Sequence, residues 1–396
     1  MYDYDISHSR PGLNPVAGLL ATAWVDEYAP ENHATRAATS ALSKLLHYHA
    51  CQPIKGKSPE VLAHQSEYVA NTIFLFNPKK CGAGSAANRR EYTSDWHNAL
   101  KLGYDVRQLK YPSWLLKCLD EVGIDASVLP KVVEPGQVIG EISTYAAERY
   151  GLTKGTVVVG GTTDSNAAFV AAAAAGGSLP EYGTAVTSLG STLAIKMLSR
   201  TFVEDSKRGV YSHRFPVLGK RDEDGDGNGD SNSSSREESW LVGGASNVGC
   251  AVLRQENFSN EELVELSKDM DVSTDSAYDY YPLTKMGERF PIADGKKEPN
   301  LDPTPDTRAE YLKGILQGIS NVERMGFQVL GELGAEPSFP DVVWTAGGGS
   351  KNDAWLQMRE RLLRDSVGGN AEVRVRRADN SESSFGAPNL AASSFS

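Results

Sequence analysis

The chain has 396 residues and a formal net charge of -11. Its length allows two or three domains with a substantial core, and the acidic balance argues against a protein that binds nucleic acid by neutralising phosphates. No apolar run approaches the ~20 residues of a membrane span, and the four cysteines form no CxxC pair, which argues against zinc and a disulfide scaffold and favours a reduced compartment.

The N-terminal part of the chain predicts mostly helices. Leu and Ala at helical spacing indicate two helices within residues 14–50, separated at Pro30. Further helices are expected within 58–76, 113–122 and 142–150.

Two short stretches separate these helices. Residues 77–90 are rich in Lys, Gly and Asn and predict a loop. Residues 94–104 begin with the cap-type residues Ser94 and Asp95 and predict a short helix that Gly103 ends.

A strand, a glycine turn and an Ala-rich helix follow one another from Val157 to Ala175. Gly160 and Gly161 allow a sharp turn, and the amides at the start of the helix favour an anionic group. Asp164 lies where the strand gives way to the helix. Two interpretations of Asp164 remain open: a carboxylate that acts in phosphoryl transfer, or a helix cap.

The C-terminal part predicts a mixed α/β domain. Residues 184–198 indicate a hairpin around Gly190-Ser191-Thr192, and residues 240–244 a strand that enters a helix ending near Arg254. The apolar periodicity of residues 307–333 predicts a long core helix.

Residues 342–363 repeat the order of strand, glycine turn and helix, and residues 372–376 predict a last strand before an Ala- and Ser-rich end. Two glycine turns that each follow an apolar strand indicate a nucleotide site. Asn352 stands where G-x-G-x-x-G needs its third glycine, and no P-loop motif occurs, so a Rossmann dehydrogenase and a P-loop protein are both poor candidates.

The acidic segment 222–230 resembles the first half of a calcium-binding loop, with oxygen ligands at positions 1, 3 and 5 and glycine at position 6. Position 12 is Ser233 instead of a bidentate Glu, and no amphipathic helices flank the segment. We therefore interpret it as a disordered hairpin tip.

These motifs, taken together and in order, resemble those of the FGGY carbohydrate kinases, which belong to the actin-like ATPase superfamily. The matching stretches are Gly161-Thr162-Thr163-Asp164-Ser165, Thr187-Ser188-Leu189-Gly190-Ser191-Thr192, Gly244-Ala245-Ser246-Asn247, Gly287-Glu288-Arg289 and Ala346-Gly347-Gly348-Gly349-Ser350-Lys351-Asn352. Within the family, residues 94–104 and 279–283 look most like the plant and cyanobacterial D-ribulose and putative xylulose kinases.

The resemblance implies an α/β fold of two ribonuclease-H-like domains. Residues 1–171 would form the sugar-binding domain, joined by 381–396, and 172–380 the nucleotide-binding domain with a disordered insert at 221–238. The family's opening Asp-x-Gly-Thr segment has no match in residues 1–90, so the first domain is expected to be truncated at its N-terminus. Pro388 also departs from the family's closing helix and would strain it beyond the first turn.

The resemblance also implies site residues. Asp164 matches the general base, Gly190, Ser191 and Thr192 match the second phosphate-binding turn, and the adenosine motif matches at Gly348, Gly349 and Asn352. The sugar pocket is expected to include Asp164, Asp95 and Asn98; for Asp95, helix capping is an equal alternative, and no metal ligand is identified.

Two further positions have competing interpretations. His97 is interpreted as a packing residue, with a bond to a sugar hydroxyl as the alternative. Glu288 and Arg289 are interpreted as a surface ion pair, with support of a turn near the nucleotide as the alternative.

The implied function is phosphorylation of a ketopentose by ATP with Mg²⁺, foremost of D-ribulose at O5. The alternatives are a D-xylulose kinase and a catalytically inactive nucleotide-binding fragment. The expected partners are the sugar and ATP, without nucleic acid or membrane, and the expected location is the cytoplasm, or the plastid if a transit peptide precedes Met1. The sequence indicates no oligomeric state.

Overall fold

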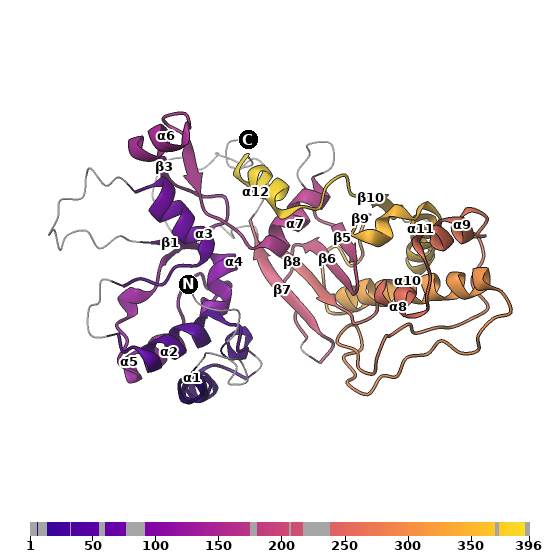
Figure 1. The fold of residues 1–396 in the computed structure, drawn as a ribbon, viewed down its shortest axis with the longest axis horizontal. Coiled ribbons are helices and arrows are strands. Elements are labelled where there is room, and N and C mark those ends of the chain that lie inside the picture. Colours follow the sequence, from indigo (N-terminus) through magenta and orange to yellow (C-terminus); the bar gives the residue numbers. More distant parts are fainter. Residues whose placement is uncertain are drawn as a thin grey trace. The chain divides into compact units, whose positions relative to one another are not determined.

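The computed structural model describes residues 6, 14–31, 33–54, 60–76, 92–174, 180–205, 207–216, 238–368 and 372–392. The chain divides into two compact units, residues 1–163 and 164–394 (Figure 1). The boundary falls between Thr163 and Asp164. The loop predicted at 77–90 and the acidic segment 222–230 lie outside the described residues.

In its described residues, the first unit is mostly helical, with two small two-stranded sheets. Parallel β1 and β2 form one sheet, and antiparallel β3 and β4 form the other. Its elements are α1 (Pro15–Tyr28), η1 (Ala34–Arg36), α2 (Ala41–Cys51), α3 (Gln65–Tyr68), η2 (Val69–Phe74), β1 (Thr93–Asp95), α4 (Trp96–Ala99), η4 (Leu100–Leu102), α5 (Ser113–Glu121), η5 (Ala126–Val128), β2 (Lys131–Val133), β3 (Val138–Glu141), α6 (Thr144–Tyr150) and β4 (Val157–Val159).

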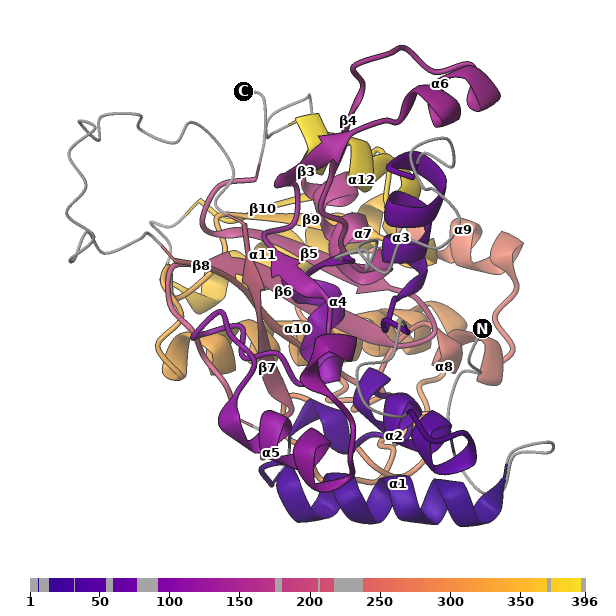
Figure 2. The same cartoon turned by 90° about the vertical axis from the view of Figure 1, so that its left-hand side faces the viewer.

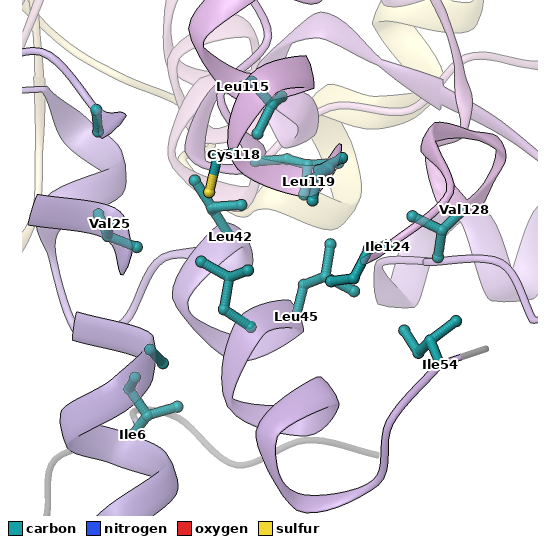
Figure 3. Close-up of a cluster of buried hydrophobic side chains, with 14 residues drawn as sticks. Ile6, Val25, Leu42, Leu45, Ile54, Leu115, Cys118, Leu119, Ile124 and Val128 are labelled. Atoms are coloured by element: carbon teal, nitrogen blue, oxygen red, sulfur yellow. The ribbon is translucent and has the colours of Figure 1, made fainter. Parts of the chain in front are cut away.

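The two N-terminal helices form as predicted on either side of Pro30. Asn14 caps α1, with Pro15 as the first helical residue, and Ser40 caps α2 by accepting a hydrogen bond from the Ser43 amide. Leu and Val side chains from α1, α2 and α5 meet in one apolar core, which includes Val25, Leu42, Leu45, Leu115 and Leu119 (Figure 3).

The helix predicted within 58–76 is shorter than expected. Residues 60–64 are not helical, and α3 begins only at Gln65, after His64 and Glu67 form a capping box. The chain then continues as the π-type turn η2. Sequence periodicity does not distinguish an α-helix from a π-helix, because both place apolar residues at similar spacing.

The second unit is a six-stranded mixed sheet with helices. The strand order is β10-β9-β5-β6-β8-β7, in which β9 pairs in parallel with both β10 and β5, and the remaining pairs are antiparallel. Its elements are α7 (Asp164–Ala173), β5 (Thr184–Leu189), β6 (Leu193–Ser199), β7 (Val210–Phe215), β8 (Ser239–Ala245), α8 (Ala251–Gln255), α9 (Asn260–Lys268), α10 (Arg308–Glu332), β9 (Val342–Ala346), η7 (Gly348–Lys351), α11 (Asp353–Ser366), β10 (Arg374–Arg377) and α12 (Ser383–Ala392).

Helices cover both faces of this sheet (Figure 2). On one face, Phe169 and Val170 of α7 pack against Leu198 of β6 and the neighbouring strands. Side chains alternate between the two faces along β6, so Ile195 points away from the face that carries Lys196 and Leu198. On that other face, Ile195 lies against Gly326 of α10. The predicted hairpin and the predicted strand, glycine turn and helix units are confirmed.

Helix α12 forms although Pro388 is its sixth residue. It packs closely on α7, where a Cβ at Gly386 would collide with the Ala167 carbonyl oxygen. Both helices belong to the compact unit 164–394, whereas the domain boundary expected after residue 171, with 381–396 in the first domain, remains a prediction. No helix in the described ranges is both long and apolar enough to cross a membrane.

Candidate functional site

A cavity of about 940 Å³ lies in the second unit, between the Gly190 turn that follows β5 and the Gly348 turn that follows β9; Gly160 and Gly161 do not line it. Gly190 and Ser191 line it from the turn between β5 and β6. Gly348, Gly349 and Asn352 line it from the segment that follows β9. Five of the six predicted nucleotide-binding residues therefore meet in one cavity, although their turns lie more than 150 residues apart in the sequence.

The turn after β5 is fixed by the start of α8. The Cys250 amide donates to the Gly190 carbonyl oxygen at 2.8 Å, and the Ala251 amide donates to the Ser191 carbonyl oxygen at 3.2 Å. Arg254 Nη2 donates to Ser191 Oγ at 3.1 Å. The turn thus presents an exposed hydroxyl next to a guanidinium, a combination suited to phosphate oxygens.

Thr192 belongs to the same turn but is not among the residues that line the cavity. Its carbonyl oxygen accepts a bond from the Gly190 amide at 3.2 Å. Gly249 approaches it so closely that a Cβ there would lie 2.5 Å from Thr192 Cα. The observed role of Thr192 is to shape the turn, and its contact with nucleotide remains a prediction.

The glycines after β9 differ in what surrounds them. A Cβ on Gly349 would lie 2.7 Å from both Leu189 Cβ and Trp355 Cζ3, whereas a Cβ on Gly348 would meet nothing within 4 Å. Gly349 is therefore needed for packing under the cavity, and Gly348 leaves open space at its wall.

Asn352 caps the helix that follows this turn. Its Oδ1 accepts a hydrogen bond from the Trp355 amide at 3.0 Å, and its Nδ2 donates to Ser267 Oγ at 2.8 Å. The side chain thereby joins α11 to α9 at the edge of the cavity. The contact with a nucleobase that the family resemblance implies for Asn352 remains a prediction.

The rest of the cavity combines an apolar wall with cations. Its apolar lining includes Phe258, Leu263, Val264, Met270 and Leu316. Arg254, Lys268 and Lys351 also line the cavity, with Asp353 as the acidic lining residue. An apolar wall beside basic groups and bare glycine backbone suits a ligand with a flat ring system and an anionic chain.

Asp164 is the first residue of α7 and is exposed. Its Oδ1 accepts a hydrogen bond from the Ser165 amide at 2.6 Å, and its carbonyl oxygen accepts one from Ser383 Oγ at 2.8 Å. The carboxylate therefore binds an amide of its own helix and still has a face open to solvent. Its role as general base remains a prediction.

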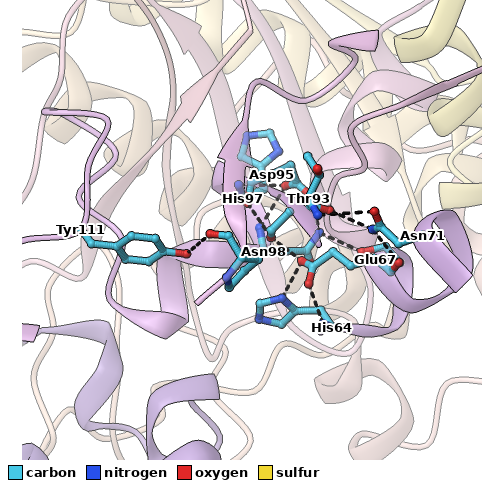
Figure 4. Close-up of polar contacts among 11 residues, drawn as sticks. His64, Glu67, Asn71, Thr93, Asp95, His97, Asn98 and Tyr111 are labelled. Atoms are coloured by element: carbon cyan, nitrogen blue, oxygen red, sulfur yellow. Dashed lines mark hydrogen bonds and ion pairs between the residues drawn. The ribbon is translucent and has the colours of Figure 1, made fainter. Parts of the chain in front are cut away.

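Asp95 lies in a polar cluster of the first unit (Figure 4). The carboxylate is 1% exposed and caps α4: its Oδ1 accepts from the amides of His97 (2.9 Å) and Asn98 (3.0 Å), and its Oδ2 accepts from Asn98 Nδ2 at 2.6 Å. Burial raises the pKa of Asp95 to about 6, although the bonds from Asn98 act in the opposite direction. Helix capping is thus confirmed, and sugar binding by Asp95 and Asn98 remains a prediction.

Glu67 is a second buried carboxylate of this cluster (Figure 4). It accepts hydrogen bonds from the His64 amide at 2.7 Å and from Ser94 Oγ, and its Oε1 lies 2.6 Å from His64 Nδ1. Sequence patterns do not reveal this contact, because Glu67 and Ser94 are 27 residues apart.

Glu288 corrects the interpretation of Glu288 and Arg289 as a surface ion pair. The Glu288 side chain is buried and accepts bonds from Ser246 Oγ (2.7 Å), the Asn247 amide (2.7 Å) and Tyr281 OH (3.0 Å). Arg289 is exposed and donates to the Ser246 carbonyl oxygen. Glu288 thus supports the turn after β8, which leads into the α8 segment beside the cavity.

Comparison with known proteins finds a family model that matches part of the chain. Residues 88–171, which include Asp95, Asn98 and Asp164, match the model of the FGGY family of carbohydrate kinases, N-terminal domain. This part of the chain is therefore similar to the N-terminal domain of that family. The xylulose kinase of Bacillus subtilis (strain 168) is 25% identical over 256 residues, 64% of this chain and 47% of the relative. The match therefore spans about half the length of that curated relative.

Solved structures of several sugar kinases have a similar fold. The xylulose kinase from Rhodospirillum rubrum superposes with a TM-score of 0.66 at 18% identity, covering 97% of this chain and 69% of its own. The gluconate kinase from Lactobacillus acidophilus superposes with a TM-score of 0.63 at 15% identity, covering 95% of this chain and 66% of its own. The Plasmodium falciparum glycerol kinase with ADP superposes with a TM-score of 0.58 at 15% identity, covering 84% of this chain and 58% of its own. The α/β, actin-like ATPase fold predicted from the sequence is confirmed.

Proposed function

We propose that this protein is an ATP-dependent sugar kinase that phosphorylates a ketopentose, foremost D-ribulose to D-ribulose 5-phosphate. The observation that carries the proposal is the cavity that the Gly190 turn after β5 and the Gly348 turn after β9 line together. Its apolar wall fits adenosine, and Ser191 with Arg254 offers donors to the phosphates.

In the proposed reaction, the oxygen of the sugar's primary hydroxyl forms a bond to the γ-phosphorus of ATP. The bond from that phosphorus to the β–γ bridging oxygen breaks, and ADP leaves. The hydroxyl proton passes to the Asp164 carboxylate. A ground-state alcohol is far too weak an acid for Asp to ionise, so the proton moves late, as bond formation to phosphorus lowers the pKa of the hydroxyl.

Magnesium is part of the proposal as a companion of the ATP phosphates. Among the described residues, no three His, Cys, Asp or Glu side chains lie together as a metal site. Mg²⁺ in kinases is commonly bound by substrate phosphates and one or two carboxylates, so we assign the ion no ligand from this chain and derive no step through it.

D-xylulose is the second candidate substrate. The curated relative at 25% identity is named a xylulose kinase, whereas D-ribulose rests on the resemblance of residues 94–104 and 279–283. In the latter segment Tyr280 and Leu283 are core residues, so its likeness reports on packing more than on sugar contacts.

The test is ADP release by the purified protein with ATP, Mg²⁺ and each of D-ribulose, D-xylulose and glycerol. The proposal predicts turnover with a ketopentose, with kcat/KM highest for D-ribulose and at least tenfold lower for glycerol. Faster turnover of D-xylulose would transfer the assignment to that sugar. Calorimetric binding of ATP without turnover of any sugar would instead support the inactive nucleotide-binding fragment.

A further inference from the structure

Lys196, in the middle of β6, is tied to the start of α7. Its Nζ donates to Ser165 Oγ at 2.6 Å, to the Ser165 carbonyl oxygen at 3.0 Å and to Asn166 Oδ1 at 3.0 Å. These three bonds use all three N–H donors of an ammonium group. Ser165 and Asn166 directly follow Asp164, so Lys196 holds the turn of helix on which that carboxylate stands.

The elements around Lys196 carry little charge. Lys196 pairs with Val186 of β5 and Gly243 of β8 and shares a sheet face with Leu198, which packs against α7. Strands β5, β6 and β8 and helix α7 contain one cation, Lys196, and one acid, Asp164. Within these elements, Asp164 is therefore the one negative charge available to Lys196, and Lys196 is the one positive charge available to Asp164.

A cation is unfavourable at this end of a helix. The N-terminus of α7 carries the positive end of the helix dipole, which repels an ammonium, and partial burial disfavours its charge. Burial lowers the pKa of Lys196 to about 8, while the negative charge of Asp164 acts to raise it. A charged amine at this position is stabilised by a nearby carboxylate, and Asp164 supplies that negative charge.

We propose that Lys196 is a positioning residue for Asp164: its ammonium fixes the first turn of α7 and holds the Asp164 carboxylate, by charge and through Ser165, in the orientation for proton transfer. The inference deepens the proposed function and rests on it for its kinetic part. Lys196 follows Thr192 by four residues, about 13 Å of strand. One hairpin thus carries the predicted phosphate turn and the residue that holds the predicted base.

The first test measures the coupling of the two charges without any assay of activity. In protein labelled with ¹³C-lysine, the ¹³Cε shift of Lys196 is followed against pH, with Lys196→Arg used to assign the signal. We expect a midpoint near pH 8 and a lower midpoint in Asp164→Asn, because the carboxylate that raises it is gone. An equal midpoint in both proteins overturns the proposal.

The second test is kinetic and compares Lys196→Met with Lys196→Arg. We expect Lys196→Met to lower kcat about tenfold to a hundredfold with the KM for ATP unchanged, and Lys196→Arg to recover part of the loss because it keeps the charge. Activity of the parent should also fall above about pH 8, where the ammonium loses its proton, and this fall should be absent in Lys196→Arg.

Lys313→Met is the matched control, since Lys313 of α10 donates to Thr274 Oγ1 at 3.1 Å, in the segment between α9 and α10. Amide hydrogen exchange of residues 160–170 should rise in Lys196→Met and stay unchanged in Lys313→Met. Faster exchange without a loss of kcat restricts Lys196 to a structural role and contradicts the proposal. A parent protein that turns over no sugar contradicts the proposed function, whereas the titration still decides the coupling.

Discussion

His97 Nδ1 lies 2.7 Å from Thr162 Oγ1, which joins the short helix after β1 to the glycine turn that leads toward Asp164. Gly161 lies in the same turn, and a Cβ there would be 3.5 Å from Asp95 Oδ2. The buried polar cluster of the first unit therefore packs directly against the segment two residues before the predicted base. The interpretation of His97 as a packing residue agrees with its burial.

Asp95 should make the protein less stable as pH rises. Its pKa in the folded state, about 6, lies above its value in an unfolded chain, so the folded state binds the proton more tightly between pH 4 and 6 and loses stability as pH rises through that window. In Asp95→Asn, which keeps a capping side chain, this loss disappears. We expect the change in unfolding free energy between pH 4 and 7 to differ from that of the parent by up to about 3 kcal/mol.

Urea unfolding of both proteins at pH 4, 5.5 and 7 measures that difference. Asp271→Asn is the opposite control, since hydrogen bonds from Ser273 and Thr274 lower the pKa of Asp271 to about 2. If the unfolding free energy of the parent and of Asp95→Asn changed equally with pH, burial would not disfavour the charged form of Asp95.

The two glycines after β9 should separate packing from ligand binding. Gly349→Ala places a Cβ against Leu189 and Trp355 and should lower stability by about 1–3 kcal/mol. Gly348→Ala enters open space at the cavity wall and should leave the melting temperature unchanged while weakening ATP binding at least tenfold. Thermal melts and calorimetric titration with ATP test both. Full ATP affinity in a stable Gly348→Ala would argue that nucleotide does not occupy this cavity.

Glu288 should be needed for the turn after β8. Glu288→Ala leaves Ser246 Oγ, the Asn247 amide and Tyr281 OH without their acceptor, and the loss of these buried bonds should cost about 2–4 kcal/mol of unfolding free energy. Glu298 is exposed, and Glu298→Ala should change stability by less than about 0.5 kcal/mol. Comparable denaturation midpoints for the two variants would show that Glu288 does not hold the turn.

The sequence alone predicted many elements of the second unit because their signals are local, although β7 and α9 were not predicted. Alternation marks β5 and β6, a long apolar stripe marks α10, and glycines follow the strands where the backbone must turn. The α/β, actin-like ATPase fold was implied by the resemblance of these motifs, taken in order, to the FGGY carbohydrate kinases.

Contacts between distant positions could not be predicted in the same way. Arg254 reaches Ser191 across 63 residues, and Lys196 reaches Ser165 across 31. In the sequence, Lys196 and Arg254 look like ordinary surface charges. Lys196 gains its partner only when β6 packs against α7, and Arg254 gains its partner only when α8 packs against the turn after β5. Glu288 was interpreted as a member of a surface ion pair for the same reason, since its partners Ser246 and Asn247 are distant in the sequence.

The central claim is that Asp164 accepts the proton from the sugar, and single-turnover phosphorylation of D-ribulose by the parent and by Asp164→Asn tests it most directly. Asn keeps the size of the side chain and an oxygen that can accept the bond from the Ser165 amide, so ATP binding should be retained. We expect the rate of phosphoryl transfer to fall by about 10²–10⁴-fold. Transfer at the parent rate in Asp164→Asn would contradict the account.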